Sequence, residues 1–139
     1  MILRKVVLDT NVYVDWLNEK IHDSLVLAPG LVRYLSAVVQ MELRAGAGTP
    51  RARRAVEELV RAYRAGRRIV VPTAAAFDDA GRVLRELQNR GVEVRRASLV
   101  NDVLIAQSAR AIGATVVSRD RDYETLKAVL EFGLQLIVN

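Results

Sequence analysis

The sequence has no cysteine and only one histidine, His22, among its 139 residues. The lack of cysteine excludes a disulfide scaffold, a thiolate nucleophile and a zinc site bound by thiolates. A single histidine excludes a metal site built from several imidazoles and argues against a Ser-His-Asp triad. Aromatic residues make up only 5% of the chain, whereas hydrophobic residues of all kinds make up 51%. We therefore expect an aliphatic core.

Long apolar runs are also missing, since none approaches the ~18 residues that a membrane-spanning helix needs. Asp9 interrupts the first apolar segment before a signal-peptide core is formed. We therefore expect a soluble, cytoplasmic protein that does not bind membranes. The composition excludes intrinsic disorder, and the length predicts a single domain over residues 1–139.

The charge is basic, with a formal net charge of +5 at pH 7, and all but three of the 21 basic residues are arginines. The planar guanidinium group suits phosphate and carboxylate partners. The charge is compatible with a nucleic acid, with an acidic protein, or with a bias in genome composition. It does not choose among them.

Short apolar runs alternate with longer segments of helical period, which is typical of an α/β protein. Strands are predicted at residues 5–8, 34–38, 69–71, 115–118 and 134–138. Helices are predicted at residues 12–18, around 41–43, and at 51–65, 73–91, 98–112 and 122–130, with Thr49, Thr73 and Ser98 as N-caps. Because the connections are helical, the predicted fold is a three-layer α/β/α sandwich with a central, mostly parallel sheet.

Acidic residues follow several of these strands, where ligands of open parallel sheets bind. Asp9 comes directly after the first strand, Glu42 about one helical turn after the second, and Asp120 after the fourth. Asp102 lies in the first turns of a predicted helix among apolar neighbours, which is unusual for a solvated face. Each acid taken alone also has an ordinary explanation, because Asp9 and Asp120 are both suitable helix N-caps.

Carboxylates that converge in one cleft repel each other and raise each other's pKa. Such a cluster is stable only when cations neutralise it, and oxygen ligands without cysteine or histidine select Mg²⁺ or Mn²⁺. These ions activate water and clamp both oxygens of a phosphodiester during in-line attack. The pattern therefore indicates metal-assisted hydrolysis.

Four segments resemble the successive motifs of PIN-domain ribonucleases, and their order and spacing are similar to those of single-domain VapC-type toxins over nearly the whole chain. They are Val6-Val-Leu-Asp-Thr-Asn11, Met41-Glu-Leu43, Asn101-Asp-Val-Leu-Ile-Ala106 and Val116-Val-Ser-Arg-Asp-Arg-Asp-Tyr123. The usual phenylalanine of the last motif is Tyr123 here, a difference that we expect to affect packing more than chemistry.

This resemblance implies a PIN-like nuclease domain that cleaves RNA with one or two Mg²⁺ or Mn²⁺ ions per site. It implies that the catalytic and metal-binding residues are Asp9, Glu42, Asp102 and Asp120. It also implies that Asn11 and Ser118 orient the carboxylates, with Asp122 as a further candidate. A small antitoxin protein and a homodimer are the partners that the resemblance implies.

Other interpretations of the sequence stay open at this point. One is a non-catalytic RNA-binding module, another is a housekeeping RNA-processing nuclease, and a phosphoacceptor domain is disfavoured because no lysine follows the last strand. Arg119 and Arg121 flank Asp120 and are candidates for RNA contact. The arginines of residues 51–68 fit either an RNA-binding surface or a solvated helix face. Asp15 is expected to face solvent.

Overall fold

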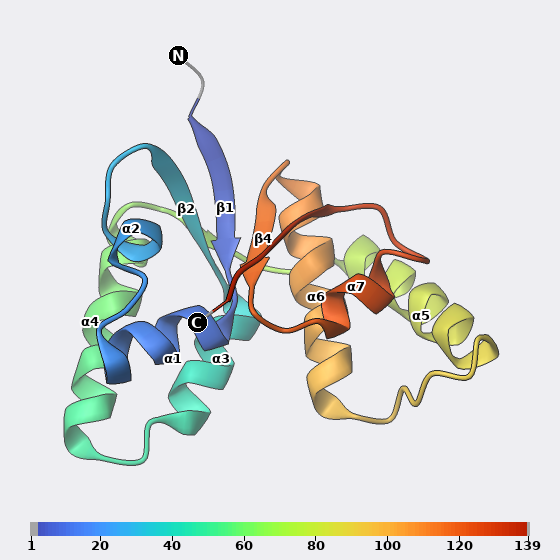
Figure 1. Cartoon of the computed structure of the whole chain (residues 1–139), viewed down its shortest axis with the longest axis horizontal. Coiled ribbons are helices and arrows are strands. Elements are labelled where there is room, and N and C mark those ends of the chain that lie inside the picture. The colour runs from blue at the N-terminus through green and yellow to red at the C-terminus, as the bar shows by residue number, and fades with distance from the viewer. Residues whose placement is uncertain (1–2, 139) are drawn as a thin grey trace.

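The computed structural model describes residues 3–138, which form one sheet with helices packed around it (Figure 1). The strands are β1 (Arg4–Leu8), β2 (Leu31–Ser36), β3 (Ile69–Val70), β4 (Thr115–Ser118) and β5 (Gly133–Leu136). The helices are α1 (Thr10–Glu19), α2 (Asp23–Val26), α3 (Ala37–Gly46), α4 (Pro50–Ala65), α5 (Ala74–Asn89), α6 (Ala97–Ala111) and α7 (Asp122–Leu126). None of the helices in this described span is long and apolar enough to cross a membrane.

All strand pairs of the sheet are parallel, in the order β3-β2-β1-β4-β5. The chain first runs outward from β1 to β3 and then returns past β1 to β4 and β5. Since crossovers between parallel strands are right-handed, this reversal places the helices of the two halves on opposite faces. The predicted α/β/α sandwich is therefore confirmed, with a sheet that is wholly parallel.

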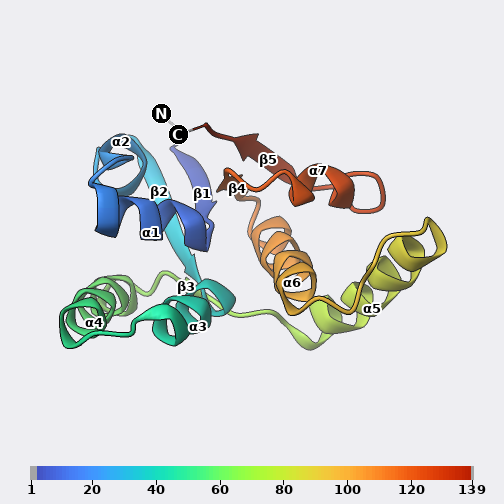
Figure 2. The same ribbon diagram turned by 60° about the horizontal axis from the view of Figure 1, so that its bottom comes forward.

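The core is aliphatic, as the composition predicted, and is centred on β1 and α6. Val6, Val7 and Leu8 of β1 are fully buried. Nearly every residue of α6 from Leu99 to Ala109 is buried, because α5 lies alongside it and the sheet covers another side (Figure 2). A helix surrounded in this way has no solvated face for an ordinary acidic residue.

Several predicted elements are confirmed. β4 has the predicted bounds, and the Thr49 and Thr73 side chains cap α4 and α5 by accepting hydrogen bonds from backbone N–H groups. The predicted strand at 34–38 was placed too late. β2 ends at Ser36 because the Ser36 hydroxyl accepts the Val38 N–H and starts α3.

Other predicted boundaries were wrong. Ser98 is not an N-cap, since α6 has already begun at Ala97 and Arg96 precedes it without a side-chain cap. The last helix ends at Leu126 rather than at residue 130, and the last strand ends at Leu136 rather than at residue 138. The short helix α2 was not predicted.

Candidate metal centre

The acidic residues of the four motifs meet at the carboxyl edge of the sheet, which lies below β1 in Figure 1. Asp9 follows β1 and is the N-cap of α1, as its ordinary explanation predicted. Glu42 comes from α3, Asp102 from α6, and Asp120 from the loop after β4. The charges of Glu42 and Asp120 act on both Asp9 and Asp102, and that of Asp9 acts on Asp102, which places the four acids in one cluster.

The Asp9 carboxylate is fixed by three hydrogen bonds. Its Oδ1 accepts the Thr10 N–H at 2.9 Å, and its Oδ2 accepts the Ser118 hydroxyl at 2.7 Å and the Asn11 amide at 3.1 Å. The Ser118 oxygen in turn accepts the Asn11 amide and the backbone N–H of Asp120. Asn11 and Ser118 therefore both contact Asp9, and they join the start of α1 to the loop that carries Asp120.

Glu42 is held by two neighbours that the sequence did not single out. Thr10 donates its hydroxyl to Glu42 Oε1 at 2.7 Å, and the Asn101 amide donates to Oε2 at 3.3 Å. Each neighbour directly adjoins another acid of the cluster, Asp9 or Asp102. Both also lie inside the motifs quoted above, but neither signal says which way a side chain points.

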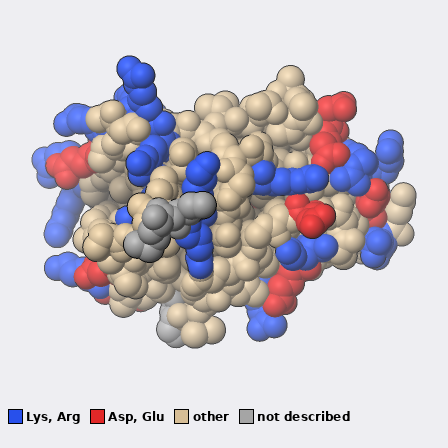
Figure 3. Space-filling model, turned by 90° about the horizontal axis from the view of Figure 1, so that it is seen from above, with Lys and Arg blue, Asp and Glu red and all other residues tan. Residues whose placement is uncertain are grey.

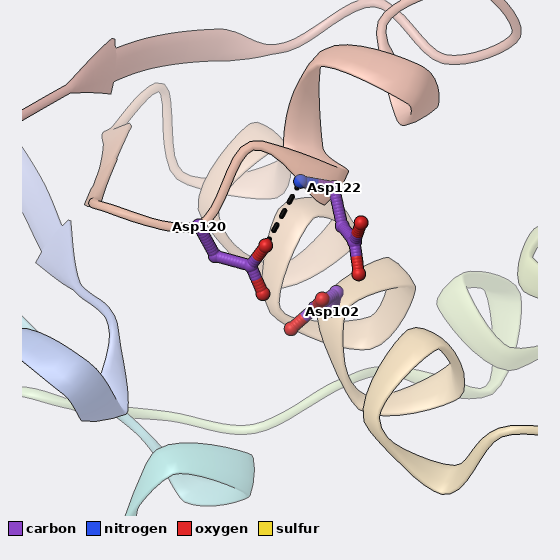
Figure 4. A group of neighbouring side chains, drawn as sticks. All are labelled: Asp102, Asp120 and Asp122. Atoms are coloured by element: carbon purple, nitrogen blue, oxygen red, sulfur yellow. Dashed lines mark hydrogen bonds between the residues drawn. The ribbon is translucent and has the colours of Figure 1, made fainter.

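Asp102, Asp120 and Asp122 form the tightest part of the cluster (Figure 4). One carboxylate oxygen from each lies within 4.8 Å of those of the other two. Asp122 also donates its backbone N–H to Asp120 at 2.9 Å and forms an ion pair with Arg96 at 3.4 Å. The structure thus brings Asp122, the further candidate, into the same group.

Burial and mutual repulsion act strongly on the ionisation of these acids. The pKa of Asp102 is raised to about 8, first by burial and then by the charges of Asp9 and Asp120. Burial also raises the pKa of Asp9, although the hydrogen bonds from Ser118 and Thr10 partly offset it. Without a counter-ion, the site therefore resists full ionisation.

The donor set fits a hard divalent cation. Asp102 is 6% exposed, and its Oδ2 has no hydrogen-bond partner among the described residues. A buried carboxylate oxygen without a donor, next to two further carboxylates, offers the ligands that a cation needs. Because all of the ligands are oxygens, Mg²⁺ and Mn²⁺ are the ions that match.

Residues 6–129 match the PIN domain family, a span that contains every acid of the cluster. The chain belongs to the PIN domain family. A search of curated protein sequences finds no significant match.

Solved structures share the fold of this PIN domain at low sequence identity. One chain of VapBC2 from Rickettsia felis, bound to a DNA fragment from its promoter, has a TM-score of 0.70 at 22% identity, covering 96% of this chain and 99% of that one. VapBC-5 from Mycobacterium tuberculosis, a member of the VapBC family of toxin-antitoxin systems, has a TM-score of 0.67 at 24% identity, covering 96% of this chain and 98% of that one. FitAcB from Neisseria gonorrhoeae has a TM-score of 0.67 at 22% identity, covering 93% of this chain and 95% of that one.

One acidic residue of this PIN domain lies where the sequence did not predict it. Asp15 is 4% exposed rather than solvent-facing. Its carboxylate pairs with Arg119 at 2.9 Å and with His22 at 3.7 Å. Arg119 is therefore tied to α1, whereas Arg121 is exposed and pairs only loosely with Glu124 at 3.4 Å. These contacts anchor the loop that holds Asp120.

Proposed function

We propose that this PIN domain is a metal-dependent endoribonuclease. Asp9, Glu42, Asp102 and Asp120 are its metal-binding and catalytic carboxylates, with Asp122 beside them. The observation that carries this proposal is the state of Asp102, a buried acid with an unpartnered oxygen and a pKa of about 8. Buried carboxylates this close together resist ionisation, so they need a bound cation before they can act as ionised groups.

In this proposal, some residues bind the metal and others hold the metal ligands in position. One or two Mg²⁺ or Mn²⁺ ions would activate a water and neutralise the phosphodiester charge. Asn11 and Ser118 both donate to Asp9 Oδ2 and fix the orientation of that carboxylate, and Thr10 and Asn101 fix Glu42 by donating to its two oxygens. Such pre-positioned ligands do not have to reorganise when the charge of the transition state develops.

Basic residues supply a general attraction for RNA. Figure 3 views the face at the amino ends of the strands, where basic side chains predominate on the left, the side of α2 and α4, and both signs mix on the right. The basic groups on this face are spread out and do not form one patch. We assign nearby RNA contact to Arg121 and, with its side chain held by Asp15, to Arg119.

We further propose that the protein is the toxin of a toxin–antitoxin pair, acts in the cytoplasm, and forms a homodimer. The structure of VapBC-5 supports the toxin role, because it is a member of the VapBC family of toxin-antitoxin systems and shares the fold of this chain. A groove of about 430 Å³ between α1, α3 and α4 is lined by Glu42 and by Arg51. A small antitoxin that fills this groove would block access to the carboxylates.

Cleavage of a pooled set of labelled RNAs tests the proposal. The wild-type protein is assayed with Mg²⁺, Mn²⁺ or a chelator, beside Asp102→Asn and the control Asp78→Asn, which changes an exposed acid on α5. We expect cleavage that needs the metal, is lost in Asp102→Asn and persists in the control. RNA binding without cleavage in every variant would favour a non-catalytic RNA-binding module instead.

A further inference from the structure

Two buried polar atoms lack a hydrogen-bond partner within residues 3–138, and both lie at the carboxylate cluster. They are Oδ2 of Asp102 and the hydroxyl oxygen of Tyr123. A buried polar group without a partner is costly, so native proteins contain few of them. Two such groups at one place indicate an arrangement that is completed by something else.

The two groups are neighbours. Tyr123 follows Asp122 at the start of α7, and α7 packs on α6, which carries Asp102. A hydrogen-bond interaction between the two side chains lowers the pKa of Asp102 and raises that of Tyr123, although the pair does not meet full hydrogen-bond geometry in this arrangement. The Tyr123 ring is fully buried and packs edge-on against Phe132 at 6.2 Å, which fixes the position of the hydroxyl.

Asp102 also differs from the other acids in having no donor of its own. Asp9 accepts three hydrogen bonds, Glu42 accepts two, and Asp120 accepts the Asp122 N–H. No described residue donates to Asp102 with full hydrogen-bond geometry, and the side chain that interacts with it as a donor is Tyr123. An ionised carboxylate only accepts hydrogen bonds, whereas a phenol donates one, and such charge-assisted bonds are the strong ones.

We propose that Tyr123 is a positioning residue for Asp102: its hydroxyl donates to one carboxylate oxygen and leaves the other free for the cation. The bond completes the site when the metal is bound. This inference rests on the proposed function, since it needs a metal at the cluster. It gives the hydroxyl of this motif position a role that phenylalanine cannot provide.

The test compares Tyr123→Phe with Tyr13→Phe by direct titration with Mn²⁺. Tyr13 is an equally buried tyrosine whose hydroxyl donates to Tyr63 at 2.8 Å. Outer-shell partners of a metal ligand typically contribute about 10- to 100-fold in metal affinity, so we expect Tyr123→Phe to raise the Kd for Mn²⁺ about tenfold. Tyr13→Phe should lower the melting temperature and leave that Kd unchanged. Equal Kd values for wild type and Tyr123→Phe would overturn the inference.

A second measurement does not depend on the folding of a variant. In wild-type protein with labelled tyrosine rings, saturating Mg²⁺ should shift the NMR signal of Tyr123 and leave that of Tyr13 in place. Mg²⁺ binding without a change at Tyr123 would contradict the positioning role alone. Absence of any Mg²⁺ or Mn²⁺ binding by the wild-type protein would instead refute the proposed metal centre, and the positioning role with it.

Discussion

Ser118 donates its hydroxyl to Asp9 at 2.7 Å, although 109 positions separate the two residues in the chain. The contact follows from strand pairing. Leu8 of β1 lies in register with Val117 of β4, and the Asp9 N–H donates to the Val117 carbonyl at 2.9 Å. The residues that follow both strands therefore meet at the same edge, so the register of the strands determines which side chains come together at the site.

Replacing Ser118 by alanine should weaken both the fold and the metal centre. The change removes a donor to Asp9 and the acceptor of the Asp120 N–H. We expect the free energy of unfolding to fall by about 1–3 kcal/mol and the Kd for Mn²⁺ to rise. Urea unfolding and Mn²⁺ titration measure the two effects. The control is Ser108→Ala, which removes a buried hydroxyl bonded only to the Leu104 carbonyl within α6 and should leave Mn²⁺ affinity intact.

The stability of the metal-free protein should fall as the pH rises from about 4 to about 8. Asp102 has a pKa of about 8 in the fold against 3.8 as its ordinary value, so in this window the folded chain holds a proton that the unfolded chain has lost. Stability then decreases with pH, and the raised pKa of Asp9 acts with the same sign. Melting temperatures recorded in a chelator between pH 5 and pH 8 should show this decline. Asp102→Asn should flatten it, and an equally steep decline in that variant would refute the assignment.

Added Mg²⁺ or Mn²⁺ should stabilise the protein, and more strongly at pH 8 than at pH 5, because cations bind ionised carboxylates. Metal at 100 times its Kd should add about 2.7 kcal/mol to the free energy of unfolding. Excess chelator should reverse the gain. Calorimetric melting with Asp102→Asn and Asp78→Asn separates specific binding from a general salt effect, since only the control should keep the full gain.

Arg119 and Arg121 should behave differently when each is changed to alanine. Arg119→Ala leaves the buried Asp15 with one charged partner fewer, so we expect a loss of about 1–3 kcal/mol in the free energy of unfolding. Arg121→Ala removes an exposed side chain and should leave stability unchanged while weakening RNA binding. Urea unfolding measures the stability of both variants, and RNA titration at two salt concentrations measures their RNA binding. Addition of Asp15→Asn should recover part of the stability lost in Arg119→Ala, and no recovery would contradict the ion-pair explanation.

Local signals in the sequence predicted the layers of the fold and the convergence of the acids. Neighbouring residues determine the apolar runs of β1 and β4 and the Thr49 cap of α4, so these features could be predicted from the sequence. The position of Asp15 was not, because its burial depends on an arginine 104 positions away. The Tyr123 hydroxyl is a similar case, since its place beside Asp102 depends on how α7 packs on α6. The exchange of phenylalanine for tyrosine was expected to concern packing, yet the added oxygen lies at the site.

The order of the strands also has a consequence during synthesis of the protein. Of the five strands, β1 is synthesised first but lies in the middle of the sheet, and its second neighbour, β4, is translated only after β2 and β3. A nascent chain therefore carries Asp9 on an incompletely paired strand until β4 and Asp120 follow. A chain that stops before Asp120 therefore lacks one of the proposed metal ligands, so the proposed metal centre cannot form before β4 has been synthesised.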